Sequence, residues 1–152
     1  EEGWNIPASK AELRAEFADW HPHVTRIIEA APQDKLFKWA LCARSPLMRW
    51  VRGRAAVLGD AAHPLLPYLG QGAVMAIEDA VVLGRAFAES EDLAQALARY
   101  EAARVGRARL VVERSSLQVP RFHADDPDAF HHDVPVDEAL GLFKYDPAHA
   151  PV

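Results

Sequence analysis

The stretch GRAAVLGDAAHPLLPYLGQGA, from Gly53 to Ala73, carries the residues best suited to hold a ligand. Asp60 follows a short apolar run, and ligands of open α/β sheets bind beyond the carboxyl ends of the strands. An acid at that point can accept hydrogen bonds from the hydroxyls of a sugar or polyol chain. The alternative, that Asp60 only caps the next turn, stays open on position alone.

Gly70 and Gly72 flank Gln71 and allow the backbone to approach a flat ligand closely. Gly72 also opens a predicted helix, whose first N–H groups and dipole favour nearby negative charge by roughly 0.3–2 kcal/mol. The alternative is a tight turn that enters a helix, and no Gly-Lys-Ser/Thr follows to make a phosphate loop. Together these residues predict one wall of a pocket for a flat, hydroxyl-bearing, electron-accepting ligand.

A metal site is not expected. His63 is a candidate ligand, base or packed loop residue, but no second His or Cys lies at metal spacing around it. A second set of possible metal ligands lies in the C-terminal tail, but it does not form a complete ligand set. A solvated tail is the better interpretation. That set comprises His123, Asp125, His131 and His132. Glu78 and Asp79 fall on the first two turns of the predicted helix, where negative charge is favourable, so they need no catalytic role.

The stretch from Arg49 to Leu83 resembles the second FAD-binding signature of the single-component flavoprotein aromatic hydroxylases. The resemblance rests on GRAAVLGDAAH followed by P…GQGA…AIEDA..L, a long and specific pattern. The segments EEGW, PLMRW and LFKYD are also similar to the branch of salicylate hydroxylase and 3-hydroxybenzoate 6-hydroxylase.

This resemblance implies a role for each matching residue. Asp60 would bond a ribityl hydroxyl of FAD, Pro67 would lie beside the isoalloxazine ring, and the amides that begin at Gly72 would face its pyrimidine edge. Leu66 and Tyr68 would touch the aromatic substrate, and no residue matches the catalytic base. The implied FAD contacts are Gly59, Asp60, Ala61, Pro67, Gly72, Ala73 and Val74.

The family's reaction, by the same resemblance, uses NADH or NADPH to reduce FAD and O2 to hydroxylate a small phenolic or hydroxy-acid type aromatic substrate. The family's GxGxxG and middle Asp-Gly motifs do not occur here. We therefore expect the C-terminal part of such an enzyme, inactive without its N-terminal part, and a homodimer remains open. Two alternatives stand beside this hypothesis: a non-catalytic truncated module or scaffold fragment, and an FAD-dependent epoxidase or reductase.

Composition and charge indicate which classes of binding partner are not expected. The net charge of −5 disfavours nucleic acid, which needs a basic surface. No apolar run reaches the length of a membrane span, so no membrane partner is expected. The one cysteine, Cys42, excludes an internal disulfide, fits a reducing cytoplasm, and is expected to be a small packed residue. The arginines from Arg99 to Arg114 lie among glutamates and indicate a solvated helix of mixed charge.

Local signals predict the elements that position these residues. Ser9 and Glu12 form a capping box that begins a helix over 10–19, and Pro22 begins a second helix with Val24, Ile27 and Ile28 as its buried stripe. Alternation predicts a strand over 35–44. The apolar run 54–60 predicts a buried parallel strand, whose neighbours would come from sequence that is not here.

Two long helices follow in the prediction, over 72–88 and 93–116, and Pro120 closes the second. The helical pattern of the first is carried by Ala73, Ala76, Ile77, Ala80, Val81, Leu83 and Phe87. We expect a helix-rich α/β fold: the end of a substrate domain plus the last strand, loop and helices of a Rossmann-like FAD-binding domain. The expected boundaries are 1–50 for the substrate domain, 51–118 for the FAD-binding domain, and 119–152 for an irregular C-terminal extension.

Overall fold

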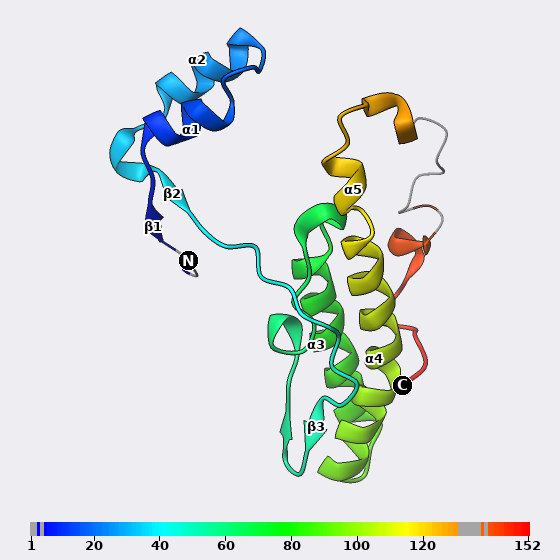
Figure 1. Cartoon of the computed structure of the whole chain (residues 1–152). Coiled ribbons are helices and arrows are strands. Elements are labelled where there is room, and N and C mark those ends of the chain that lie inside the picture. Colours follow the sequence, from blue (N-terminus) through cyan, green and yellow to red (C-terminus); the bar gives the residue numbers. More distant parts are fainter. Residues whose placement is uncertain (1–2, 4, 131–137, 139) are drawn as a thin grey trace. The chain divides into compact units, whose positions relative to one another are not determined.

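A computed structural model of the chain describes residues 3, 5–130, 138 and 140–152 (Figure 1). The structure is helix-rich with short strands, and it divides into two compact units, Glu1–Leu41 and Cys42–Val152. Each unit is described by itself. The predicted domain boundaries at 50/51 and 118/119 stay predictions.

The first unit pairs two short strands and two short helices. Its elements are β1 (Ile6–Pro7), α1 (Lys10–Glu16), α2 (Pro22–Ala30), the 3-10 turn η1 (Gln33–Lys35) and β2 (Phe37–Lys38). Strand β1 is antiparallel to β2. The predicted capping box is confirmed, because Ser9 Oγ accepts from the Glu12 N–H at 3.1 Å and Glu12 Oε2 accepts from the Ser9 N–H at 2.8 Å.

Three predictions for this unit overestimated the length of a helix, the length of a strand and the burial of a helix face. Helix α1 ends at Glu16, and the strand predicted over 35–44 is reduced to β2. In α2 only Ile28 of the predicted stripe is buried, whereas Ile27 is 72% exposed. A helix this short turns one narrow face to its neighbours, so the adjacent apolar position stays in solvent within the described unit.

The second unit is built on two long helices that lie side by side (Figure 1). Its elements are β3 (Val51–Arg52), β4 (Ala55–Ala56), η2 (Gly59–Ala61), η3 (Pro67–Leu69), α3 (Gly72–Ala88), α4 (Leu93–Ser116), α5 (Val119–Phe122), η4 (Pro127–Phe130) and η5 (Leu142–Lys144). Helices α3 and α4 match the predicted ranges. A short turn joins them, and Asp92 caps α4 by accepting from the Gln95 N–H at 2.8 Å.

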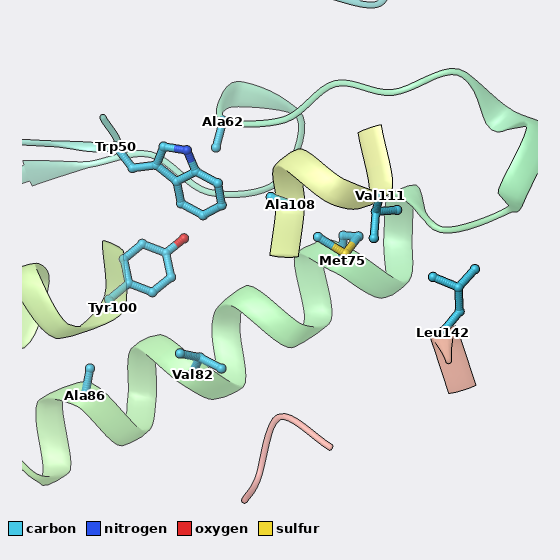
Figure 2. Close-up of a cluster of buried hydrophobic side chains, with 9 residues drawn as sticks. All are labelled: Trp50, Ala62, Met75, Val82, Ala86, Tyr100, Ala108, Val111 and Leu142. Carbon is cyan, nitrogen blue, oxygen red and sulfur yellow. The ribbon is translucent and has the colours of Figure 1, made fainter. Parts of the chain in front are cut away.

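A hydrophobic core fills the space between these helices, the β3–β4 hairpin and the C-terminal segment (Figure 2). Its buried members are Trp50, Ala62, Met75, Val82, Ala86, Tyr100, Ala108, Val111 and Leu142. Leu142 belongs to η5, so this part of the C-terminal extension packs against the helix pair. The His131–His132 pair considered as a metal site lies outside the described residues.

The run 54–60 is not a buried parallel strand in this structure. Strands β3 and β4 form an antiparallel hairpin that reverses at Gly53, where φ is +61°. Leu58 is 42% exposed, and the described residues contain no parallel strand pair. A parallel strand needs neighbours joined by long crossovers, and no segment of the described chain lies alongside to supply one.

The helix predicted from Gly72 is confirmed as α3, and several residues of its apolar pattern are exposed in this chain. Ile77 is 64% exposed and Phe87 48%, while Glu78 and Asp79 are buried. The expectation that the α4 arginines are solvated fails at Arg104, which has no exposed surface. Arg104 is buried together with Glu78 and Asp79 because these acids of α3 pair with it across the two helices.

Two smaller findings complete the fold. Cys42 is exposed, so it is not the packed residue that its apolar neighbours suggested. Across the described ranges, no helix combines the length and apolar character needed to cross a membrane.

Candidate functional site

The turn after β4 and the start of α3 enclose a cavity of about 420 Å³. Its lining residues are Asp60, Leu65, Leu66, Pro67, Gly70, Gly72, Ala73 and Ala76. Asp60 is the one charged side chain among these lining residues, and no described residue forms a hydrogen bond or ion pair with its carboxylate. The cavity therefore combines an apolar wall with a single available acid.

Gly59 places Asp60 at the cavity. Its φ of +56° lies in the left-handed region, which favours glycine. A Cβ at this position would lie 3.3 Å from Cβ of Ala76, tighter than an ordinary contact, so a side chain here would require α3 or the turn to shift by a few tenths of an ångström. The Gly59 N–H then donates to Oδ2 of Asp79 at 2.9 Å.

The opposite wall is bare backbone at the start of α3. Gly70, with φ of +63°, ends η3, and a Cβ at Gly70 or Gly72 would meet no described atom within 4 Å. Gln71 precedes the helix without a capping hydrogen bond from its side chain. The first N–H groups of α3 have no acceptor within their own helix, so they can donate to a ligand.

Asp79 is the centre of a buried polar cluster beneath this turn. Its Oδ2 lies 2.6 Å from Nε2 of His63, and its Oδ1 accepts from Nε of Arg104 at 2.7 Å. None of these three side chains has exposed surface. Burial by itself would raise the pKa of Asp79, but the hydrogen bonds from His63, Gly59 and Arg104 outweigh burial and hold that pKa below its usual value.

The cluster continues across α4 to the C-terminal segment. Arg104 Nη1 lies 2.8 Å from Oε2 of Glu78, and Arg107 binds the same carboxylate with two hydrogen bonds of 2.7 and 2.6 Å. The Arg107 guanidinium lies 3.8 Å from the ring centroid of Tyr145. Burial opposes the charge of Arg104, but Asp79 and Glu78 together raise its pKa further above its already high value.

Leu66 and Tyr68 lie on either side of Pro67 but have different surroundings. Leu66 lines the cavity, and its carbonyl oxygen accepts from Ser115 Oγ at 2.5 Å. Tyr68 does not line the cavity. Its hydroxyl lies 3.2 Å from Nε2 of His123, and its ring packs against Phe122 with centroids 4.9 Å apart.

The structure thus gathers part of the predicted set around one cavity. The predicted residues that line it are Asp60, Leu66, Pro67, Gly72 and Ala73. Gly59 lies buried beneath the turn, whereas Ala61 and Val74 are exposed outside the cavity lining.

Sequence reasoning missed the residues that support the turn, namely His63, Asp79 and Arg104. The sequence offered one signal for the ion pairs between α3 and α4. Two adjacent acids, Glu78 and Asp79, lie in the first helix, and two arginines one turn apart, at 104 and 107, lie in the next. In the described part of the chain, no group of three His, Cys, Asp or Glu side chains lies where it could hold a metal ion.

A family model described as "FAD binding domain" matches residues 7–115. Since this match covers most of the chain, the chain belongs to the FAD binding domain family. Among curated relatives, 6-hydroxynicotinate 3-monooxygenase of Bordetella bronchiseptica is 46% identical over 132 residues, which are 85% of this chain and 34% of that protein. Aurachin C monooxygenase/isomerase of Stigmatella aurantiaca is 44% identical over 108 residues, which are 71% of this chain and 28% of that protein.

Solved structures agree with this assignment. HpxO of Klebsiella pneumoniae, complexed with FAD and uric acid, superposes with a TM-score of 0.70 at 32% identity, covering 92% of this chain and 39% of that one. A salicylate hydroxylase substrate complex gives a TM-score of 0.74 at 26% identity, covering 100% of this chain and 40% of that one. The chain spans about a third of the length of the curated relatives it matches.

Proposed function

We propose that this chain supplies the ribityl and flavin wall of the FAD site in a monooxygenase that hydroxylates a small aromatic substrate. The observation that carries the proposal is the available Asp60 carboxylate in a cavity whose opposite wall is the bare start of α3. The family match and the named activities of the relatives support it.

The donors and acceptors of this cavity fit FAD. Asp60 accepts a hydrogen bond from a ribityl hydroxyl, and the first amides of α3, at Gly72, Ala73 and Val74, donate to the pyrimidine edge of the ring. Because the dipole of α3 favours negative charge near its first amides by roughly 0.3–2 kcal/mol, these residues would suit a cofactor edge that becomes more negative on reduction. Bound FAD supplies electron transfer from NADH or NADPH to O2, the chemistry that hydroxylation requires.

The remaining residues of the turn have shaping roles in this proposal. Gly59 and Ala61 fix the approach of Asp60, and Pro67 holds the wall beside the flavin with its restricted backbone. Leu66 contacts the aromatic substrate from the cavity. The substrate contact implied for Tyr68, which does not line this cavity, stays a prediction.

The substrate class follows from the relatives. Their names specify hydroxynicotinate, 3-amino-4-hydroxybenzoate and urate, which are small planar rings that carry oxygen. No residue of this chain is assigned as the catalytic base in this proposal. A homodimer and a cytoplasmic location remain predictions.

The test is the FAD affinity of the full-length protein that carries this sequence. Asp60→Ala is expected to weaken FAD binding by about 1.5–3 kcal/mol, because a charge-assisted hydrogen bond is lost. This corresponds to about tenfold or more in the dissociation constant, measured by flavin fluorescence titration. Glu91→Ala, an exposed acid in the turn before α4, serves as control. Equal affinity of the wild type and Asp60→Ala would contradict the assigned role.

Two further measurements, FAD binding and product formation by the full-length protein, distinguish this proposal from the two alternative functions. A full-length protein without FAD affinity is the non-catalytic module. A protein that binds FAD and oxidises NADH or NADPH but yields no hydroxylated product from salicylate, hydroxybenzoates or hydroxypyridines is an epoxidase or reductase.

A further inference from the structure

We infer that Asp79 is a positioning residue that holds Asp60 toward the proposed FAD, acting through the backbone and the His63 side chain at the two ends of the Asp60 turn. The inference rests on the proposed function. It adds a role for the buried cluster beneath the cavity.

One carboxylate oxygen fastens both ends of the turn. Oδ2 of Asp79 accepts from the Gly59 N–H at 2.9 Å, directly before Asp60, and lies 2.6 Å from Nε2 of His63, shortly after it. An ionised carboxylate only accepts, so Nε2 donates in this contact. The Nδ1 atom of His63 is buried without a partner among the described residues, which leaves Asp79 as the polar anchor of this ring.

Asp79 is itself fixed from the other side. Its Oδ1 is held by Arg104, a residue of α4 with no exposed surface, so the carboxylate cannot rotate away from the turn without breaking an ion pair. The ring of Trp50 lies 5.3 Å from the ring of His63. The anchor is therefore packed as well as hydrogen-bonded.

Asp60, in contrast, has no anchor of its own. Its side chain is exposed, and within the described chain its carboxylate has no hydrogen-bond partner. Its direction is therefore set by the backbone of the turn, and that backbone is fastened by Asp79. Positioning Asp60 before the ligand arrives reduces the ordering cost of binding, which raises affinity.

The experiment compares two adjacent carboxylates of α3 in the full-length protein, Asp79→Asn and Glu78→Gln. Both replace a buried, arginine-paired carboxylate by its amide, but only Asp79 contacts the turn. Asn offers one oxygen where Asp offers two, so it cannot serve Arg104 and both ends of the turn together.

Two quantities are measured in each variant: the rate of amide hydrogen exchange and the FAD dissociation constant. Amide hydrogen exchange without FAD is expected to accelerate about tenfold or more over 59–63 in Asp79→Asn and to stay at the wild-type rate there in Glu78→Gln. The FAD dissociation constant is expected to rise about tenfold or more in Asp79→Asn only. Equal effects of the two variants on exchange and on affinity would overturn the inference, because general destabilisation would then explain both.

A second pair of variants decides the case in which Asp79→Asn does not fold. His63→Gln keeps a donor near the position of Nε2, whereas His63→Leu removes it. We expect faster exchange over 59–63 and weaker FAD binding in His63→Leu, with recovery toward wild type in His63→Gln. Identical behaviour of these two variants would overturn the inference.

Failure of the inference and failure of the proposed function give different results. A wild-type protein that binds no FAD ends the proposed function, and the exchange rates then show whether Asp79 holds the turn. A wild type that binds FAD, with weaker binding in Asp60→Ala but not in Asp79→Asn, ends the inference alone.

Discussion

Asp79 shows how a charge without solvent contact is kept ionised inside a small unit. Burying a carboxylate is costly unless it is paired and hydrogen-bonded, and Asp79 receives Arg104, His63 and the Gly59 N–H. Removing the charge leaves Arg104 with an incomplete set of partners. Breaking a buried ion pair of this kind costs about 3–5 kcal/mol.

This residue gives a pH prediction. The pKa of Asp79 is lower in the folded state than its ordinary value, so its contribution to stability is complete above about pH 4 and is lost as pH falls through the lowered pKa. Asp79→Asn should therefore be less stable than the wild type at pH 7, and the gap should narrow below about pH 4. Urea unfolding of the chain at a series of pH values measures this, and a gap that is constant down to the acid limit would contradict it.

At the scale of the element, a comparison of Gly59 and Gly70 distinguishes the cost of left-handed backbone strain from the cost of close contact with a neighbouring helix. Gly59 and Gly70 both have positive φ, but only at Gly59 would a Cβ press on a neighbour, 3.3 Å from Ala76 Cβ. Gly70→Ala should cost about 1–2 kcal/mol of unfolding free energy from backbone strain alone. Gly59→Ala should cost more. Denaturant unfolding without FAD compares them, and equal losses would show that contact with α3 is unimportant.

The cap of α1 gives a second prediction at this scale. Ser9→Ala removes the acceptor for the Glu12 N–H and should lower the stability of the first unit by about 1 kcal/mol. Ser9→Thr, which keeps the hydroxyl, is the matched control. Thermal unfolding of both variants checks the prediction, and equal melting temperatures of the two variants would contradict it.

The sequence predicted what local chemistry decides and missed what distant partners decide. The cap at Ser9 and the bounds of α3 follow from signals within a few residues, so both were predicted correctly. The burial of Glu78 and Asp79 depends on Arg104 and Arg107, which come from another helix, so the local pattern of α3 could not predict it. The run 54–60 was expected to be completed by strands from sequence that is not here, and in this chain it takes part in the antiparallel β3–β4 hairpin.

The candidate site divides in the same way. A turn with two glycines and an acid is a local pattern, and some of its residues line the cavity around Asp60, but their contacts with a ligand stay predictions. The residues that hold this turn in place were not predicted. From the sequence, Asp79 was interpreted as a favourable charge near the start of a helix, and His63 as a candidate ligand, base or packed loop residue. Their contact joins two segments, and neither segment alone carries that information.

At the scale of the whole molecule, α3 presents an apolar strip to solvent in this chain. The strip consists of Val74, Ile77 and Val81, whose exposed side chains share one side of the helix. Exposed apolar patches of this kind mark surfaces that another part or partner covers. Since the chain spans about a third of its curated relatives, we expect the rest of the full-length protein to cover this strip.

Ile77→Asp tests that expectation by comparing two lengths of the protein. In the 152-residue chain Ile77 is 64% exposed, so the substitution should change stability by no more than about 0.5 kcal/mol. In the full-length protein it should cost several times more, because a charge would be buried without a partner. Calorimetry of both lengths measures this, and equal shifts would mean that the strip stays exposed.

The placement of Trp50 has a practical consequence. Its indole is 3% exposed and lies against His63, whereas Trp20 and Trp39 are largely exposed. Emission from an indole in such apolar surroundings is shifted to shorter wavelength, and it overlaps the near-ultraviolet and blue absorption of flavins. Quenching of this tryptophan by energy transfer would then report cofactor occupancy without any added label.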